Sequence, residues 1–112
     1  MAKVIISEKL EAEINKKFKK ESVRVFNLLY SLEKNPKKGK FLGNIGKIAL
    51  KELRYKVFRF YFITDGFKLK VLDESVLTDL LIKVVRMSDK KDQQKTIDEV
   101  KDILKRFGER GF

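Results

Sequence analysis

Aromatic and cationic side chains are interleaved in the stretch Lys51–Gly66, which has the residue types best suited to chemistry. Arg54, Lys56 and Arg59 lie there among three Phe and two Tyr residues. Positive charges held on a rigid strand can bind phosphates, and aromatic rings between them can stack on bases. The stretch therefore suits contact with the backbone and the bases of a nucleic acid.

Two residue types that usually perform chemistry are missing, because the sequence has no Cys and no His. Without Cys there is no disulfide framework and no thiolate metal site. Without His the chain lacks the usual general base and the commonest metal ligand. Zinc chemistry and Ser/His or Cys/His triads are close to excluded, and we expect neither a metal nor a cofactor.

The net charge of +11 at pH 7 favours a polyanionic partner, such as nucleic acid, an acidic protein segment or anionic lipid. The charge is concentrated in the middle of the chain, where Glu52 is the one acid among nine basic residues. These are Lys34, Lys37, Lys38, Lys40, Lys47, Lys51, Arg54, Lys56 and Arg59. A charge that served solubility alone would not need this clustering.

Two amphipathic helices are expected before Asn35-Pro36, a pair of residues that cannot continue a helix. Ser7 is a candidate N-cap for the first helix, and Ser22 is a candidate for the second. The apolar positions of the first helix recur every four residues, at Leu10, Ile14 and Phe18. Together the two helices predict an α-hairpin that covers one face of a sheet.

A strand is expected in the aromatic stretch, because its side chains alternate in character. Phe58, Phe60 and Phe62 are predicted to face the helices, and Arg59 and Tyr61 are predicted to face the opposite, more open side. A first short strand is expected at residues 48–53, after a glycine-punctuated loop at 41–46. Asp-Gly at 65–66 predicts a hairpin turn, with a return strand at 67–72.

The remaining elements complete an α+β fold in a single domain, residues 1–112. Residues 73–79 are expected to be a connection, residues 80–85 a fourth strand, and residues 4–6 are a candidate extra N-terminal strand. Thr96 and Glu99 predict a capping box for a C-terminal helix that ends at Gly108. We expect the α-hairpin to pack on a small, mostly antiparallel four-stranded sheet. The apolar run at the N-terminus is too short for a signal peptide or a membrane span, so a cytoplasmic protein is expected.

Four features, in this order, resemble the RelE/ParE superfamily of toxin–antitoxin toxins, and within it the HigB-like toxins of phage-derived operons. A helical hairpin ends in Leu32–Pro36, and a basic loop leads to Glu52-Leu53-Arg54 and then to Val57–Gly66. A further strand ends in a basic loop whose Lys90–Thr96 stretch is similar to a Lys-Lys-x-x-x-Lys-Thr pattern. An amphipathic helix follows. The resemblance covers most of the chain and implies a RelE-like fold.

The resemblance also implies a function, namely cleavage of mRNA on the ribosome by a toxin that a small, acidic antitoxin holds inactive. Cleaving RNA through its own 2′-hydroxyl requires removal of a proton, stabilisation of charge on the phosphate and protonation of the leaving oxygen. Arg59 and Arg86 are candidates to stabilise the phosphate, because a guanidinium offers forked donors. Lys90 and Lys91 are candidates for proton transfer, and Tyr61 for base stacking or proton donation.

Further RNA contacts are expected from the basic stretch and its return strand, at Lys51, Arg54, Tyr55, Lys56 and Lys68. Plainer roles are open for the catalytic candidates. Arg59 could be a solvated strand residue, Arg86 could pair with Asp89 or Asp73, and the two lysines could lie in a solvated loop. Residues 87–95 hold neither the Tyr nor the His found there in many relatives. Either Lys and Arg suffice, or the chain is a weak or inactive relative.

Two other functions stay open on the sequence. One is a ParE-like toxin that poisons a topoisomerase without cutting RNA. The other is a non-enzymatic basic module that binds RNA, DNA or an acidic partner. Gyrase inhibition in vitro would indicate the first, and salt-sensitive binding to any polyanion without cleavage would indicate the second.

Overall fold

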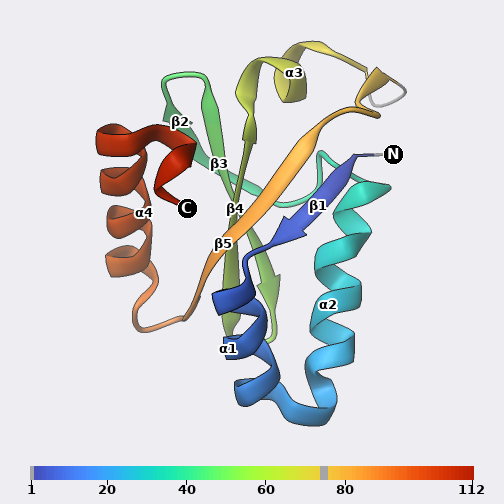
Figure 1. Ribbon diagram of the computed structural model, residues 1–112, viewed down its shortest axis with the longest axis vertical. Coiled ribbons are helices and arrows are strands. Elements are labelled where there is room, and N and C mark those ends of the chain that lie inside the picture. Colours follow the sequence, from blue (N-terminus) through green and yellow to red (C-terminus); the bar gives the residue numbers. More distant parts are fainter. Residues whose placement is uncertain (1, 74–75) are drawn as a thin grey trace.

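A five-stranded sheet with helices on both faces forms the framework of the protein (Figure 1). The computed structural model describes residues 2–73 and 76–112. The strands are β1 (Lys3–Ile6), β2 (Lys40–Ile45), β3 (Ile48–Tyr55), β4 (Phe58–Asp65) and β5 (Leu81–Asp89). The helices are α1 (Glu8–Phe18), α2 (Ser22–Tyr30), α3 (Gly66–Val71) and α4 (Gln93–Phe107). Short 3₁₀ turns follow α1, α2 and α4 at Lys19–Glu21, Ser31–Glu33 and Gly108–Gly111.

The order of strands across the sheet is β1-β5-β4-β3-β2. β1 pairs with β5 in parallel, and every other neighbouring pair is antiparallel. The α+β class and the mostly antiparallel sheet are therefore confirmed, as is the extra N-terminal strand. The expected count of four strands is wrong, because the sheet has five.

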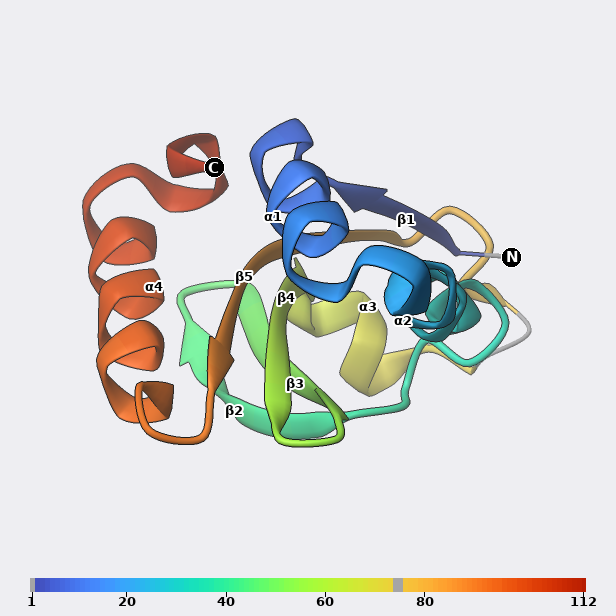
Figure 2. The same ribbon diagram turned by 90° about the horizontal axis from the view of Figure 1, so that it is seen from below.

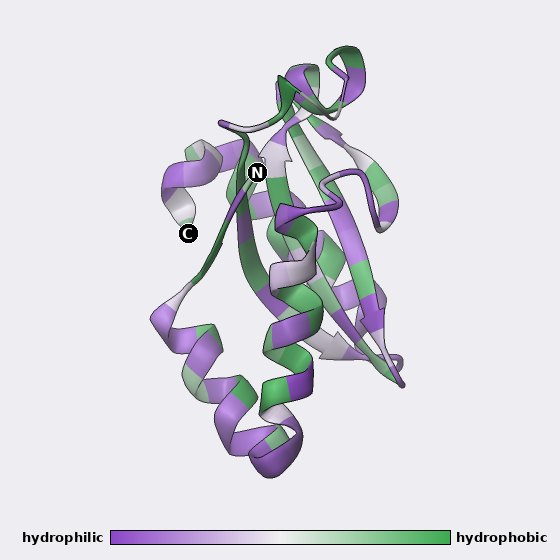
Figure 3. Ribbon diagram, turned by 90° about the vertical axis from the view of Figure 1, so that its right-hand side faces the viewer, coloured by the Kyte–Doolittle hydropathy of each residue, from purple (hydrophilic) through white to green (hydrophobic). Residues whose placement is uncertain are grey.

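The α-hairpin covers one face of the sheet, on the same side as α3 (Figure 2). The hydroxyl of Ser7 accepts a hydrogen bond from the backbone N–H of Leu10, which makes it the predicted N-cap of α1. Ile14 from α1 and Leu29 from α2 pack in one core with Phe60 and Phe62 of β4. The predicted direction of the Phe side chains is thus confirmed. Figure 3 shows hydrophobic residues concentrated along the central strands.

Helix α4 covers the opposite face of the sheet, on the other side from α1 and α2 (Figure 2). Its apolar side, with Ile97, Val100 and Leu104, packs in a second core with Tyr61 and Ile63 of β4. The alternation alone predicted that this face would be the more open one. That prediction is wrong, because α4 covers the face. The amphipathic helix needs an apolar surface to cover, and this face of β4 supplies it.

The hairpin of the aromatic stretch lies nine residues earlier than the sequence predicts, between β3 and β4 at Lys56-Val57. Lys56 takes a positive φ of 53° there, without the Gly or Asn that usually marks such a turn. Asp65 does not form a turn with Gly66 but caps α3, since its side chain accepts a hydrogen bond from the N–H of Lys68 at 3.0 Å. The predicted return strand at 67–72 is therefore wrong.

Other local predictions have mixed outcomes. Residues 40–45 form the edge strand β2, where the sequence predicts a loop at 41–46. Asp92, not Thr96, is the N-cap residue of α4, so the predicted capping box is wrong. Gly108 ends α4 with a φ of 62°, as predicted. The connection expected at 73–79 includes residues 74–75, which lie outside the described residues.

Candidate nucleic-acid interface

A buried ion pair between β3 and β4 lies beneath the N-terminal part of α4. Glu52 and Arg59 are 7% and 3% exposed, and Arg59 Nε lies 3.8 Å from Glu52 Oε1. Arg59 Nη1 donates a hydrogen bond to the carbonyl oxygen of Val57 at 2.8 Å. Among the described residues, Arg59 Nε is the one fully enclosed side-chain N or O atom without a hydrogen-bond partner. The Arg59 side chain is therefore held inside the protein and does not reach the solvent.

Glu52 keeps only a small part of its side chain, 8%, at the surface. Its Oε1 accepts a hydrogen bond from Gln93 Nε2 of α4 at 3.1 Å, whereas no described donor bonds to Oε2. Because Oε2 is not among the enclosed, unpartnered atoms, it must reach the surface. The carboxylate is thus held through Oε1, while Oε2 has no described donor and is not fully enclosed, an arrangement compatible with accepting a proton from a bound molecule.

A hollow of about 440 Å³ lies over this carboxylate. Its wall holds Lys38 and Lys40, at the start of β2, together with Arg54 of β3 and Gln93 of α4. Lys38, Lys40 and Arg54 are exposed, and none of them has a salt bridge to a described carboxylate. The hollow therefore presents three free cations around one carboxylate, an arrangement that suits a phosphodiester and a neighbouring proton donor.

Gly39 lets the two cationic residues beside it approach β3 closely. It has a φ of 104°, and a Cβ at this position would lie 2.8 Å from the carbonyl oxygen of Glu52. A side chain would push β2 away from β3 at the point where Lys40 pairs with Glu52. The wall of the hollow thus depends on a glycine.

Tyr61 is fully buried in the core beneath α4. Its hydroxyl lies 2.8 Å from Ser88 Oγ, close enough for a hydrogen bond in either direction. Burial raises the pKa of the Tyr61 phenol, while the hydrogen bond with Ser88 opposes part of that rise. A buried, hydrogen-bonded phenol cannot stack on a base, so the predicted stacking role is wrong.

Arg86 lies on the same face but is committed to partners within the protein. Its Nε donates a hydrogen bond to Glu99 Oε1 of α4 at 3.1 Å, and its guanidinium lies 5.1 Å from the centre of the Phe112 ring. The expected alternative partners, Asp89 and Asp73, are not the ones it meets. Arg86 therefore helps to hold α4 and the C-terminal residues against β5.

Lys90 and Lys91 are exposed in the connection between β5 and α4. They precede Gln93, which lines the hollow, by only a few residues. Of the catalytic candidates, Arg59 thus lies behind the hollow, and Tyr61 and Arg86 serve packing. The two lysines are exposed and do not line the hollow.

The predicted RNA contacts do not form a single surface. Arg54 lines the hollow, whereas Lys51 is buried on the other face of the sheet. Tyr55 and Lys56 both bond to Glu21, beyond the end of α1, and this contact lowers the pKa of Glu21 and raises that of Lys56. Lys68 pairs with Asp79 at 3.2 Å, at the α3 end of the molecule.

The sequence prediction missed Glu52 as a functional residue, although a signal for it was present. It is the one acid within the basic run between Lys34 and Arg59. A single acid in such a run suggests a structural partner or a chemical role. Glu52 pairs with Arg59 and also lines the hollow.

No family model matches the chain, and neither a curated protein nor a solved structure shows significant similarity to it. Residues 2–73 and 76–112 contain no cluster of three or more acidic side chains able to hold a metal ion. Over the same residues, no helix combines the length and the apolar character that crossing a bilayer requires.

Proposed function

We propose that the protein is a RelE-like toxin that binds single-stranded RNA across the hollow over Glu52 and cleaves it by attack of a 2′-hydroxyl. The observation that carries the proposal is the Glu52 carboxylate, which lines the hollow together with Lys38, Lys40 and Arg54 and has no described donor on Oε2. The likeness to the RelE/ParE superfamily is supported by an N-terminal strand, an α-hairpin, a mostly antiparallel sheet and a C-terminal helix.

The chemistry follows from this arrangement. Glu52 Oε2 takes the proton from a ribose 2′-hydroxyl, and the 2′-oxygen attacks the adjacent phosphorus. Lys38, Lys40 and Arg54 stabilise the charge that develops on the phosphate oxygens. The bond to the 5′-oxygen then breaks, and a cation of the hollow or a water molecule returns a proton to that oxygen. The products carry a 2′,3′-cyclic phosphate and a 5′-hydroxyl.

The positions of the other candidates change their roles. Arg59 touches Glu52 from inside the protein, so it is a positioning residue and not a phosphate clamp. Lys90 and Lys91 are exposed and precede Gln93 of the hollow by a few residues, so they would extend the positive surface along which RNA can run. A small, acidic antitoxin in the cytoplasm would inhibit the toxin by covering this surface.

Primer extension on mRNA from cells that express the protein tests the proposal. Wild type should arrest growth and produce new mRNA 5′ ends, and Glu52→Gln should abolish both. Because this change also removes the counter-ion of the buried Arg59, circular dichroism of the purified variant must show that it is folded. Lys16→Ala removes one charge from an exposed position of α1 and serves as a matched control that keeps both effects.

Growth arrest with intact mRNA would overturn the proposal. If the arresting protein also inhibits gyrase in vitro, a ParE-like function replaces it. If wild type leaves growth and mRNA unchanged but binds RNA in a salt-sensitive way, the non-enzymatic binding function replaces it.

A further inference from the structure

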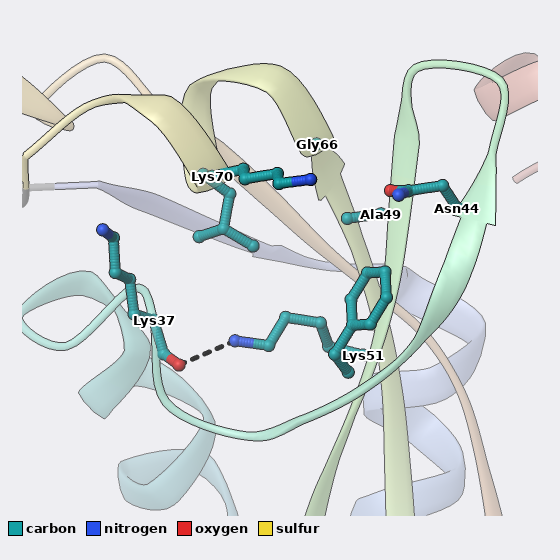
Figure 4. A pocket seen from close by; sticks show the side chains of 8 residues that line it. Lys37, Asn44, Ala49, Lys51, Gly66 and Lys70 are labelled. Atoms are coloured by element: carbon teal, nitrogen blue, oxygen red, sulfur yellow. Dashed lines mark hydrogen bonds between the residues drawn. The ribbon is translucent and has the colours of Figure 1, made fainter.

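A second pocket lies on the opposite face of the sheet from the hollow, between α3 and the β2–β3 hairpin (Figure 4). Its volume is about 370 Å³, within the range of about 300–1,000 Å³ that small-molecule sites usually have. Lys51 and Glu52 are neighbours on β3, and strand alternation sends their side chains to the two faces. The pocket and the hollow are thus separate sites.

The charged residues that line the pocket are all cationic. Lys37, Lys51 and Lys70 line it, and none of the described residues that line it is acidic. In Figure 4, Lys51 extends from β3 toward Lys37, and Lys70 extends from α3 across the upper side of the same space. Three cations therefore line the pocket without a carboxylate among its described lining residues.

Lys51 is the unusual member of this group, because it is only 4% exposed. Its Nζ donates one hydrogen bond, to the carbonyl oxygen of Lys37 at 2.8 Å, and lies 5.8 Å from the centre of the Phe62 ring. An ammonium has three donors, and no described carboxylate lies within ion-pair distance of this one. Burial, and next the charge of Lys37, lower the pKa of Lys51.

A buried ammonium without a counter-ion is costly, so proteins normally pair it or use it. Replacing Lys51 by an apolar residue would remove this cost, which makes a purely structural role a poor account of the residue. A bound anion would supply both the missing charge and acceptors for the free donors.

The rest of the lining is apolar or neutral. Phe41, which is 54% exposed overall, lines the pocket together with Ala49 and Leu69. Asn44 adds an amide that can donate and accept hydrogen bonds. A ligand that fits this lining has an apolar or aromatic body and one strongly anionic group.

We propose that this pocket binds a phosphate monoester with an aromatic body, of the size of a nucleoside monophosphate. The phosphate would occupy the space between Lys37, Lys51 and Lys70, and the aromatic body would lie against Phe41 and Leu69. A phosphate monoester has a charge of about −1.5 to −2 at pH 7, which balances the charge of three lining lysines better than the single charge of a carboxylate ligand does. The site is independent of RNA cleavage in the hollow.

Nuclear magnetic resonance titration of ¹⁵N-labelled protein with adenosine monophosphate tests the proposal. We expect saturable shifts of the backbone amides of Ala49, Gly66 and Leu69. Adenosine and inorganic phosphate each lack one half of the ligand and should bind at least about tenfold more weakly. Lys51→Met should weaken binding of adenosine monophosphate about tenfold or more, since it removes a charged donor and keeps a long apolar side chain.

Two controls keep the test decisive. Lys47→Ala removes one charge from the β2–β3 turn outside the pocket and should leave the affinity unchanged. Lys70→Ala changes an exposed side chain of the pocket and should weaken binding even if Lys51→Met fails to fold. Shifts that do not saturate at these amides, equal binding by the Lys51 or Lys70 variant and wild type, or an equal loss in the Lys47 variant would overturn the proposal.

Discussion

Glu52 and Arg59 form a diagonal pair on neighbouring strands, because Glu52 lies opposite Tyr61 and Arg54 lies opposite Arg59. Both side chains are buried, and the 3.8 Å between Nε and Oε1 is an ion-pair distance and not a hydrogen bond. Arg59 Nε has no hydrogen-bond partner, and Glu52 Oε2 accepts no hydrogen bond from a described donor, so the contact between the two side chains is loose. A carboxylate held in this way is positioned for chemistry without being neutralised by a tight contact.

Removing Arg59 should destabilise the fold. Arg59→Ala leaves Glu52 buried without its cation, and breaking a buried pair in this way typically costs about 3–5 kcal/mol of unfolding free energy. Arg54 lies opposite Arg59 on β3 and is exposed, so Arg54→Ala should change the free energy of unfolding by less than about 0.5 kcal/mol. Urea denaturation of the two variants compares them directly. Equal stabilities would show that the buried pair contributes little.

The phenol of Tyr61 makes stability depend on pH in the alkaline range. Its pKa is raised in the folded state above the ordinary value of 10.0, so the neutral form is favoured by folding. This contribution is fully present below about pH 10 and is lost as pH rises through the raised pKa. The difference in unfolding free energy between wild type and Tyr61→Phe should therefore be constant below pH 10 and shrink above it. A difference that stays constant throughout would contradict the burial of this hydroxyl.

At the scale of elements, sequence patterns predicted what depends on local periodicity. Ser7 caps α1, and alternation placed Phe60 and Phe62 against the α-hairpin. The burial of Arg59 and Tyr61 could not be predicted in this way. Alternation shows that two residues share a face, but not that α4, more than thirty residues later, covers that face.

The segment from Asp65 to Val71 shows where local signals conflict. Asp-Gly favours a hairpin turn, but an Asp three residues before the N–H of Lys68 is equally an N-cap. Six residues are too few for a helical period to show. Two tertiary contacts favour the helix. Gly66 N donates a hydrogen bond to the carbonyl oxygen of Lys47, and Leu69 is buried in the core.

Gly39 should be among the least replaceable glycines of the chain. Gly39→Ala imposes a φ of 104° on a residue with a Cβ and brings that Cβ to 2.8 Å from the carbonyl oxygen of Glu52, at an expected cost of about 1–3 kcal/mol. Gly46→Ala also has a positive φ, 59°, but meets no atom within 4 Å and should cost about 1 kcal/mol. Thermal unfolding of both variants measures the difference. An equal loss of stability in the two variants would show that the close approach of residue 39 to the Glu52 carbonyl oxygen does not affect stability.

At the scale of the whole molecule, the excess charge of +11 is divided by the sheet. Lys38, Lys40 and Arg54 gather on the α4 side, and Lys37, Lys51 and Lys70 gather on the side of α3. The sequence predicted a basic protein with a polyanionic partner but not this division. Strand alternation and the path of β2 separate cations that are close neighbours along the chain.

The central claim is that Glu52 activates a ribose 2′-hydroxyl in the basic hollow. The most direct test is incubation of the protein, alone and with programmed ribosomes, with an end-labelled RNA and with the same RNA carrying a 2′-deoxy substitution at the cleaved nucleotide. Wild type should cut only the unmodified RNA and leave a 2′,3′-cyclic phosphate, and Glu52→Gln should cut it about 10²–10⁴-fold more slowly. Cleavage of the 2′-deoxy substrate, or an undiminished rate in the Glu52 variant, would contradict the claim.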